Sequence, residues 1–214
     1  MRVRRKAWIP ERIQELSHLV VTNPTEYKGQ WRRYFKNDYP LHVEVGTGKG
    51  RFITTLADQN RQVNFIGVEY VLDVIYYAAL RAADLESAHI ALLCVDVSEI
   101  LDVFAANEIN RLYINFCDPW PKTRHAKRRL THREFLARYK EILARGGEIH
   151  FKTDNEQLFE FSLNEFAGDR DFQLKNIALD LHGSNPKNNV MTEYEEKFSN
   201  MGMKIYRFEA MYMP

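Results

Sequence analysis

The sequence predicts an α/β fold in which a mostly parallel sheet is covered by helices on both faces. Two observations predict it: apolar strand-like runs alternate with helix-like segments from residue 41 onward, and the connections between them are short. The 214 residues are 45% hydrophobic and 28% charged, which suits one soluble globular domain. We therefore expect a single domain over residues 1–214, with a basic N-terminal arm and helix over 1–40 and the α/β core over 41–214.

Hydrophobic periodicity places the individual elements. Buried strands are predicted over residues 41–46, 64–70, 89–97, 111–118 and 147–154. Helices are predicted over 50–60 and 72–86, with a shorter one over 11–20 ahead of the core. A further helix has its apolar face over 135–143 and is expected to end at Gly146-Gly147, since glycines commonly terminate helices. The strand-like runs 172–183 and 204–213 flank a short helix over 191–198, and predict a terminal antiparallel strand.

Composition excludes several classes of protein. No apolar stretch approaches membrane-spanning length, and the basic segment at the start is not followed by an apolar signal core. Cys94 and Cys117 lie in apolar runs, without the spacing of a metal site or a disulfide framework. We therefore expect two core thiols in a reducing cytoplasm, no metal and no membrane partner.

The formal net charge of +1 conceals a segregated pattern. Residues 1–40 carry nine basic and four acidic side chains, a net charge of +5, and residues 41–110 carry four and ten, a net charge of −6. Residues 111–145 carry ten and three, a net charge of +7, and residues 146–214 carry seven and twelve, a net charge of −5. Basic blocks of this kind indicate a local footprint for a polyanion, although solvated helix faces give the same pattern.

A glycine-rich loop follows the first core strand. Its sequence, GTGKG over residues 46–50, allows the backbone to turn tightly and to approach a ligand closely before a helix begins. A Walker loop requires Ser or Thr after the lysine, but Gly50 follows Lys49. A dinucleotide-binding loop has the spacing G-x-G-x-x-G, and a pyrophosphate would be repelled by Glu44 two residues before the first glycine. A nicotinamide-dependent oxidoreductase is thus the less favoured interpretation.

Four successive strands each end in a carboxylate: Glu44, Glu69, Asp96 and Asp118. Open α/β sheets bind ligands at the edge where these strands end. An acid beside the glycine loop suits a cationic ligand without phosphates, and S-adenosylmethionine carries both a sulfonium and an ammonium. Glu69 is placed to hold ribose hydroxyls, and Asp96 to accept from the adenine amine. Each acid alone is also explained as a helix cap, above all Asp96.

The fourth strand runs into Asp118-Pro119-Trp120-Pro121 and then into a cluster of five Lys/Arg and a histidine over residues 122–129. Cys117 has two interpretations, a nucleophile for a covalent pyrimidine mechanism or a core thiol. Alternation along the strand points it away from Asp118 and favours the core. Trp120 either stacks on a base or packs between the two prolines.

Several segments together resemble the bacterial tRNA (guanine-N7-)-methyltransferases over essentially the whole chain. They are EVGTGKG, the strand ends GVE and CVD, DPWPKTRHAKRRL, HFKTDN and MTEYEEKF. The resemblance implies a Rossmann-like class I methyltransferase fold with a seven-stranded, mostly parallel sheet and an antiparallel terminal strand. It also implies methyl transfer from S-adenosylmethionine to N7 of guanosine 46 in the tRNA variable loop, leaving S-adenosylhomocysteine. The alternatives are another methyltransferase acting on RNA bases and a non-catalytic RNA-binding protein with this fold.

The resemblance also implies roles for individual residues. Asp118 would be the catalytic residue. The cofactor would be bound by Glu44, Gly46, Gly48, Glu69, Asp96 and Asp118. The substrate and its RNA would be bound by Lys122, Arg124, His125, Lys127, Arg128, Arg129, Asp154, Thr192, Glu193, Tyr194 and Glu195. The partner would be tRNA, and we expect a cytoplasmic monomer or homodimer.

The chemistry agrees with this assignment. Guanine N7 has a lone pair and no proton, so methyl transfer needs no general base, and alignment of nucleophile, methyl group and sulfur supplies much of the acceleration. A preorganised carboxylate at Asp118 would stabilise the positive charge as it moves onto the purine. Asp154 and Glu195 are candidate acceptors for guanine N1-H and the exocyclic amine. The alternative is a capping box over Thr192–Glu195 and a helix N-cap at 154–155.

The basic cluster completes the RNA hypothesis. The N7 edge of guanine lies in the deep major groove of A-form RNA, which side chains do not read, so the target base must be exposed or displaced. Residues 122–129, aided by Arg2, Arg4 and Arg5, would hold the surrounding backbone through salt-sensitive phosphate contacts.

Overall fold

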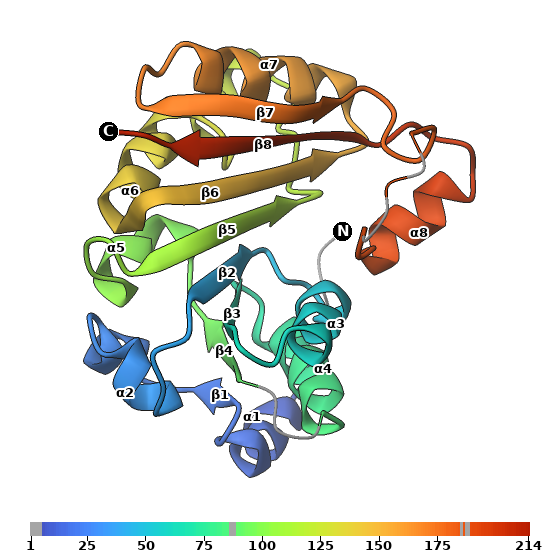
Figure 1. Cartoon of the computed structure of the whole chain (residues 1–214). Helices are drawn as coiled ribbons and strands as arrows, with labels where there is room; N and C mark the ends of the chain where they lie inside the picture. The colour runs from blue at the N-terminus through green and yellow to red at the C-terminus, as the bar shows by residue number, and fades with distance from the viewer. Residues whose placement is uncertain (1–5, 86–88, 185, 187–188) are drawn as a thin grey trace. The chain divides into compact units, whose positions relative to one another are not determined.

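The computed structural model describes residues 6–85, 89–184, 186 and 189–214 (Figure 1). The chain divides into two compact units, Met1–Ala105 and Ala106–Pro214, and each is described by itself. Arg2, Arg4 and Arg5, which were expected to aid RNA binding, lie outside the described residues. The organisation of residues 1–214 as a single domain stays a prediction.

The first unit contains four parallel strands in the order β1-β4-β3-β2. They are β1 (Val20–Val21), β2 (Leu41–Val45), β3 (Asn64–Glu69) and β4 (Ile90–Cys94). The helices are α1 (Ile9–Arg12), η1 (Ile13–Leu16), η2 (Pro24–Tyr27), α2 (Trp31–Phe35), α3 (Arg51–Gln59), α4 (Leu72–Ala83), η3 (Val97–Glu99) and α5 (Ile100–Val103). Val45 pairs with Val68, and Glu69 pairs with Cys94, so the three long strands end at one edge. Short crossover helices between parallel strands produce this arrangement.

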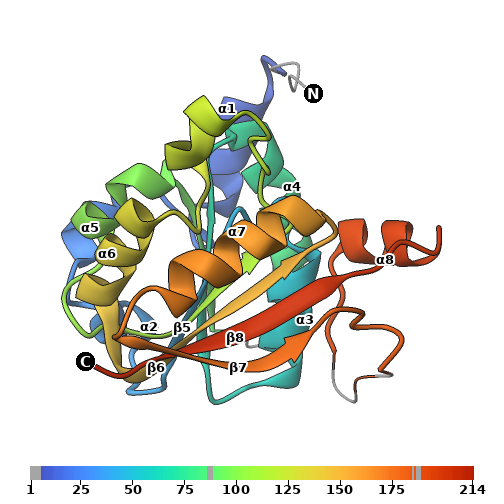
Figure 2. The ribbon, with the colours of Figure 1, turned by 90° about the horizontal axis from the view of Figure 1, so that it is seen from above.

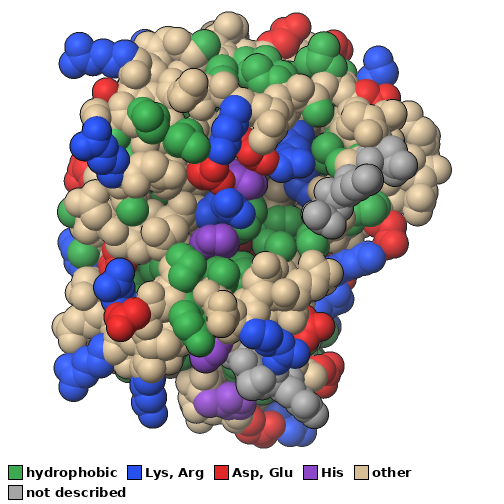
Figure 3. Space-filling view, in the orientation of Figure 1, with side chains coloured by type: hydrophobic (Ala, Val, Ile, Leu, Met, Phe, Trp, Pro, Cys, Tyr) green, Lys and Arg blue, Asp and Glu red, His purple; other side chains and the backbone are tan. Residues whose placement is uncertain are grey.

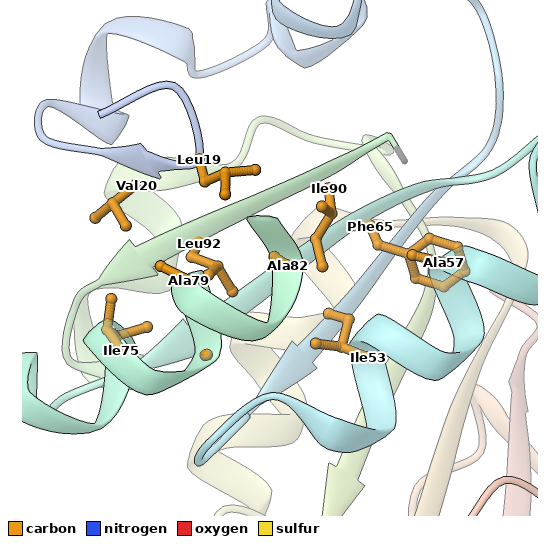
Figure 4. Close-up of a cluster of buried hydrophobic side chains, with 11 residues drawn as sticks. Leu19, Val20, Ile53, Ala57, Phe65, Ile75, Ala79, Ala82, Ile90 and Leu92 are labelled. Atoms are coloured by element: carbon orange, nitrogen blue, oxygen red, sulfur yellow. The ribbon is translucent and has the colours of Figure 1, made fainter. Parts of the chain in front are cut away.

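Apolar side chains of α3 and α4 form the core of the first unit against the strands. Figure 4 shows Ile53 and Ala57 of α3 and Ile75 of α4 in one cluster with Phe65 and Leu92 of the sheet. All five are almost completely buried. On the other side of these strands lie α2 and α5, as Figures 1 and 2 show. Helices therefore cover both faces of the sheet in this unit.

The second unit contains the strands β5 (Ile109–Asn115), β6 (Leu143–Thr153), β7 (Phe172–Ala178) and β8 (Tyr206–Tyr212) in the order β5-β6-β8-β7. β5 and β6 are parallel, whereas β8 is antiparallel to both β6 and β7. The helices are η4 (Thr123–Arg128), α6 (Arg133–Ile142), α7 (Glu156–Ala167) and α8 (Glu193–Ser199). The predicted terminal antiparallel strand is confirmed.

The two faces of the second sheet differ in chemistry. On one face Phe151 and Phe208 pack together, and Phe159 and Phe166 of α7 pack onto Phe208. Figure 2 shows α6 and α7 on this side. Side chains alternate along a strand, so the intervening residues face the other way. Figure 3 shows acidic, basic and histidine side chains close together on that face, where Figure 1 draws β6 and β8.

The structure corrects three predictions. The described residues contain eight strands instead of seven, because the two-residue β1 also pairs with β4. The helix expected to end at Gly146-Gly147 ends at Ile142, and both glycines lie within β6, where the ladder is irregular between the pairs Ile109–Leu143 and Arg111–Glu148. Cys94, expected in the core, is exposed because it is the last residue of β4.

No helix of the described chain is both long and apolar enough to span a bilayer.

Candidate functional site

The glycine loop of the first unit joins β2 to α3. The amides of Gly46 and Thr47 both donate to Val68 O, at 2.8 and 3.0 Å, which fastens the loop to the end of β3. Gly46 and Gly48 have φ of 75° and 57°, a backbone region that L-residues rarely adopt. A Cβ built on either glycine meets no atom within 4 Å. The glycines are therefore required by conformation, and the space beside them suits the close approach of a ligand.

Two predicted carboxylates hold this loop. Glu44 is only 1% exposed, and its Oε2 accepts a hydrogen bond of 2.6 Å from the Thr47 hydroxyl. The two carboxylate oxygens of Glu69 accept from the amides of Gly48 at 3.2 Å and Val71 at 3.1 Å. Buried or half-buried carboxylates need such donors. The loop and both acids thus lie together at the carboxyl edge of the sheet.

Asp96 follows β4 at the same edge of the first unit. Its Oδ1 accepts from the amide of Ser98 at 2.8 Å, so it caps η3 as the capping alternative predicted. The side chain is nevertheless exposed. A cap bond to one oxygen leaves acceptor capacity on the carboxylate for a ligand.

In the second unit, Asp118 lies exposed in a turn just after β5. Two non-glycine residues of this segment, Phe116 and Trp120, have positive φ, of 50° and 41°. Such conformations are strained and persist only where the surroundings impose them. Here Arg129 donates from Nε to Pro119 O and from Nη2 to Trp120 O, both at 3.1 Å. The Arg129 guanidinium also lies 4.3 Å from the centroid of the Phe161 ring.

The other residues of the basic cluster differ in their surroundings. Lys127 forms an exposed ion pair of 2.6 Å with Glu134. Arg128 lies 4.9 Å from the centre of the Trp120 ring, which His125 contacts edge-on at 5.7 Å. Trp120 therefore packs against cluster side chains. In the part of the chain that the structure describes, Lys122 and Arg124 are exposed and form no ion pair.

Cys117 does not resemble a nucleophile. Burial, followed by the charge of Asp118, raises the pKa of its thiol to about 12. A reactive cysteine has a lowered pKa and an electropositive environment, because the thiolate is the nucleophile. The raised pKa therefore argues against a nucleophile. Because β5 ends at Asn115, strand alternation does not place Cys117, and the residue is half-buried instead of lying in the core as expected.

The segment over 192–195 and Asp154 lie near each other in the second unit. The Tyr194 hydroxyl donates to Asp154 Oδ2 at 3.4 Å, and burial together with this carboxylate raises the pKa of Tyr194. Thr192 Oγ1 accepts from the amide of Glu195 at 2.9 Å, so Thr192 caps α8 as the capping alternative predicted. Asp154 is not the cap of α7, since Asn155 fills that position by accepting from the Leu158 amide at 2.8 Å.

In the structure Glu195 forms an ion pair with Lys152, a contact that the sequence did not predict. Glu195 is completely buried, and its Oε2 accepts a 2.5 Å hydrogen bond from Lys152 Nζ. The Glu195 side chain therefore turns into the protein, away from the reciprocal bond of a capping box. One signal was available, since Lys152 is a cation within a strand predicted to be buried. Glu193, also predicted to contact substrate, is exposed at the start of α8.

One group of described side chains has the composition of a metal site: Glu148, His150 and Glu209 on the polar face of the second sheet. Arg111 forms a 2.8 Å ion pair with Glu148, which also pairs with Lys175. Hydrogen bonds, first from His150 and then from Lys175, hold the pKa of Glu148 well below its usual range. The acids are thus neutralised by protein cations, and we assign no metal to them.

The chain matches known proteins over most of its length. A family model described as a putative methyltransferase matches residues 38–208. The chain is 49% identical over 210 residues to the tRNA (guanine-N(7)-)-methyltransferase of Bacillus subtilis (strain 168), covering 98% of each. It is also 49% identical over 212 residues to the enzyme of the same name from Streptococcus mutans, covering 99% of this chain and 100% of that one.

Solved structures show the same fold at low sequence identity. The 16S rRNA methyltransferase KamB has a TM-score of 0.63 at 12% identity, covering 87% of this chain and 92% of that chain. The 16S rRNA (adenine(1408)-N(1))-methyltransferase from Catenulisporales acidiphilia has a TM-score of 0.62 at 11% identity, covering 87% and 93%. These likenesses confirm the Rossmann-like methyltransferase fold. The family model and the near full-length identities show that this chain belongs to the family of the bacterial tRNA (guanine-N(7)-)-methyltransferases.

Proposed function

We propose that this protein transfers a methyl group from S-adenosylmethionine to N7 of guanosine 46 in the variable loop of tRNA. The observation that carries the proposal is the 49% identity over 98% of both chains with a relative of that name. Because tRNA is the proposed substrate, we also propose that the protein is cytoplasmic. Its state as a monomer or a homodimer stays a prediction.

The first unit supplies a suitable cofactor site. Glu44, Glu69 and Asp96 place carboxylates at one sheet edge, which favours a ligand with a sulfonium and an ammonium. Side chains at Gly46 and Gly48 would occupy the space next to the loop, so the cradle fits a ligand that approaches the backbone closely. When bound, S-adenosylmethionine supplies an electrophilic methyl group. Glu69 would accept from its ribose hydroxyls, and Asp96 from its adenine amine.

The catalytic role falls to Asp118. Guanine N7 attacks with its own lone pair, so the reaction requires no proton acceptor at this position. As the resemblance implies, the Asp118 carboxylate would stabilise positive charge as it moves from sulfur to the purine. Electrostatic stabilisation of this kind depends on preorganisation, and the Arg129 bonds to Pro119 O and Trp120 O supply it.

The second unit supplies the proposed RNA contacts. Lys122 and Arg124 are exposed and carry no ion pair within the described residues, which leaves their charges available to phosphates. Arg128 is exposed above the Trp120 ring and would add a further phosphate contact. Asp154 would accept hydrogen bonds from guanine, as the resemblance implies.

Transfer of a labelled methyl group to unmodified tRNA tests this function. Wild-type protein should label the tRNA, and Asp118→Ala should lose transfer while its affinity for tRNA stays within about twofold, because phosphate contacts dominate RNA affinity. Normal tRNA binding without any transfer would identify a non-catalytic RNA-binding protein. Calorimetry with S-adenosylmethionine and with a nicotinamide dinucleotide tests the oxidoreductase alternative. We expect S-adenosylmethionine to bind and the nicotinamide dinucleotide not to bind.

A further inference from the structure

Lys152 is a buried cation on β6, with 5% of its surface exposed. Its ammonium donates to Glu195 Oε2 at 2.5 Å, to Val190 O at 2.9 Å and to Asn189 Oδ1 at 3.3 Å. A lysine ammonium has three protons, so these acceptors use its donor capacity fully. All three acceptors belong to the segment that leads into α8 or to its first turn. Lys152 therefore fastens this segment to the end of the sheet.

Glu195 is also buried, and both of its carboxylate oxygens accept hydrogen bonds within the protein. Its exposed fraction is 0%, and in addition to Lys152 it accepts from Asn189 Nδ2 at 2.7 Å through Oε1. His182 Nε2 lies 3.2 Å from the same oxygen without hydrogen-bond geometry. A carboxylate buried and bonded in this way does not present an oxygen to a base. Its neighbours Tyr194 and Glu193, by contrast, are exposed.

A second contact lies beside the first. Asp154 follows Lys152 by two residues at the end of β6, and Tyr194 precedes Glu195 in α8. The Tyr194 hydroxyl donates to Asp154 Oδ2 at 3.4 Å. The first turn of α8 is thus joined to the end of β6 at two adjacent positions, one through a buried ion pair and the other through a more exposed hydrogen bond.

The same contacts reach the turn that carries Asp118. The amide of Phe116 donates to Lys152 O at 2.9 Å, and the Phe116 ring lies 5.1 Å from the ring of Tyr194. Displacement of α8 would therefore remove a packing partner of Phe116, two residues before Asp118. This couples the position of α8 to the proposed catalytic segment.

We propose that Lys152 and Glu195 form a buried ion pair that positions the first turn of α8, so that Glu195 acts as a positioning residue and does not contact guanine. Through this pair, Tyr194 and Asp154 are held in place for the target base. The proposal rests on the function proposed above and assigns Lys152 a part in it. Loss of one member of a buried pair leaves an uncompensated charge, which forces local rearrangement.

Substitution of Lys152 tests the positioning role. Lys152→Met should lower kcat about 100-fold, the effect expected of a misplacement of about 1 Å at a reacting centre. Its affinity for tRNA should stay within about threefold, because phosphate contacts elsewhere dominate that affinity. Lys152→Arg, which keeps the cation, should restore most of the lost kcat. Wild-type turnover in Lys152→Met would overturn the proposal.

A substrate analogue separates positioning from direct contact. Inosine at the target position lacks the exocyclic amine of guanosine but keeps N7. Glu195→Gln should lower transfer to both substrates by the same factor, because it acts through the position of α8. Asp154→Asn is the control for a residue facing the base and should change the ratio of the two rates. A changed ratio in Glu195→Gln would show that Glu195 contacts the base and would refute our assignment.

Amide hydrogen exchange provides a readout that does not depend on activity. In Lys152→Met the amides of α8 should exchange faster than in wild-type protein, while those of α3 in the first unit should not change. Unchanged exchange in α8 would contradict the proposal even if the protein had no methyltransferase activity. Failure of wild-type protein to transfer methyl groups would, by contrast, count against the proposed function alone.

Discussion

Replacing Arg129 by alanine tests which of two roles this residue has. It either stabilises the turn that carries Asp118 or contacts RNA, as the resemblance implies. The change removes two hydrogen bonds, to Pro119 O and Trp120 O, and a ring contact with Phe161. Hydrogen bonds from charged groups contribute roughly 1.5–3 kcal/mol each, and the lower end applies because the side chain is half-buried. The cation–π contact adds roughly 1 kcal/mol.

The expected loss in the free energy of unfolding is about 2–4 kcal/mol, after allowance for water replacing part of the lost bonding. Urea denaturation measures it as a lower midpoint with an unchanged slope. The rate of methyl transfer should also fall, because Asp118 is no longer preorganised. Arg124→Ala is the matched control, since Arg124 is an exposed arginine of the same cluster without an ion pair among the described residues.

Arg124→Ala should change stability by less than about 0.5 kcal/mol and should weaken tRNA binding instead. The assignment of Arg129 to the Asp118 turn is wrong if Arg129→Ala unfolds at the wild-type midpoint and weakens tRNA binding as much as Arg124→Ala does. That outcome would indicate that Arg129 contacts RNA.

Three further predictions follow from single contacts. Gly50→Ala should destabilise the protein by about 2–5 kcal/mol in urea denaturation, since positive φ and overpacking both oppose the new methyl group; a Cβ there meets α4 at 2.8 Å. Gly48→Ala, with positive φ but open space, should cost only about 1–2 kcal/mol, and equal losses would exclude the steric explanation. Arg128→Ala should reduce the slope of log affinity against log salt by about one, as expected for one lost phosphate contact, and an unchanged slope would mean a solvated charge. Hydrogen bonds from His150 and neighbouring cations hold the pKa of Glu148 below its ordinary value of 4.5, so its contribution to stability is present above that pH and is lost as the pH falls. Glu148→Gln should therefore lose less stability than wild-type protein between about pH 5 and pH 3 in thermal denaturation, and parallel curves would contradict this.

The sequence predicted the parts of the fold that depend on local pattern. Apolar alternation located the long strands. The positions of the glycine loop, Glu44 and Glu69 predicted that they meet at one edge of the sheet, because parallel strands end together. It did not predict β1, since two residues carry too short a pattern. Nor did it place Cys94, whose position at the strand end exposes it in spite of its apolar neighbours.

The hydrophobic and charge pattern of the sequence did not predict contacts between residues far apart in the chain. Lys152 and Glu195 are 43 residues apart, and their pairing depends on where α8 packs. Arg129 belongs to a basic run that is typical of RNA binding, yet its guanidinium turns back to the preceding turn. Residue type indicated the charge in both cases, whereas tertiary packing decided which partner that charge meets.

Nucleoside mass spectrometry of unmodified tRNA, after incubation with this protein and S-adenosylmethionine, identifies the atom that is methylated. We expect 7-methylguanosine as the new nucleoside, and its loss when the guanosine at position 46 is replaced by adenosine. The appearance of a methylated adenosine or cytidine in its place would contradict the proposed methyl transfer to guanine N7.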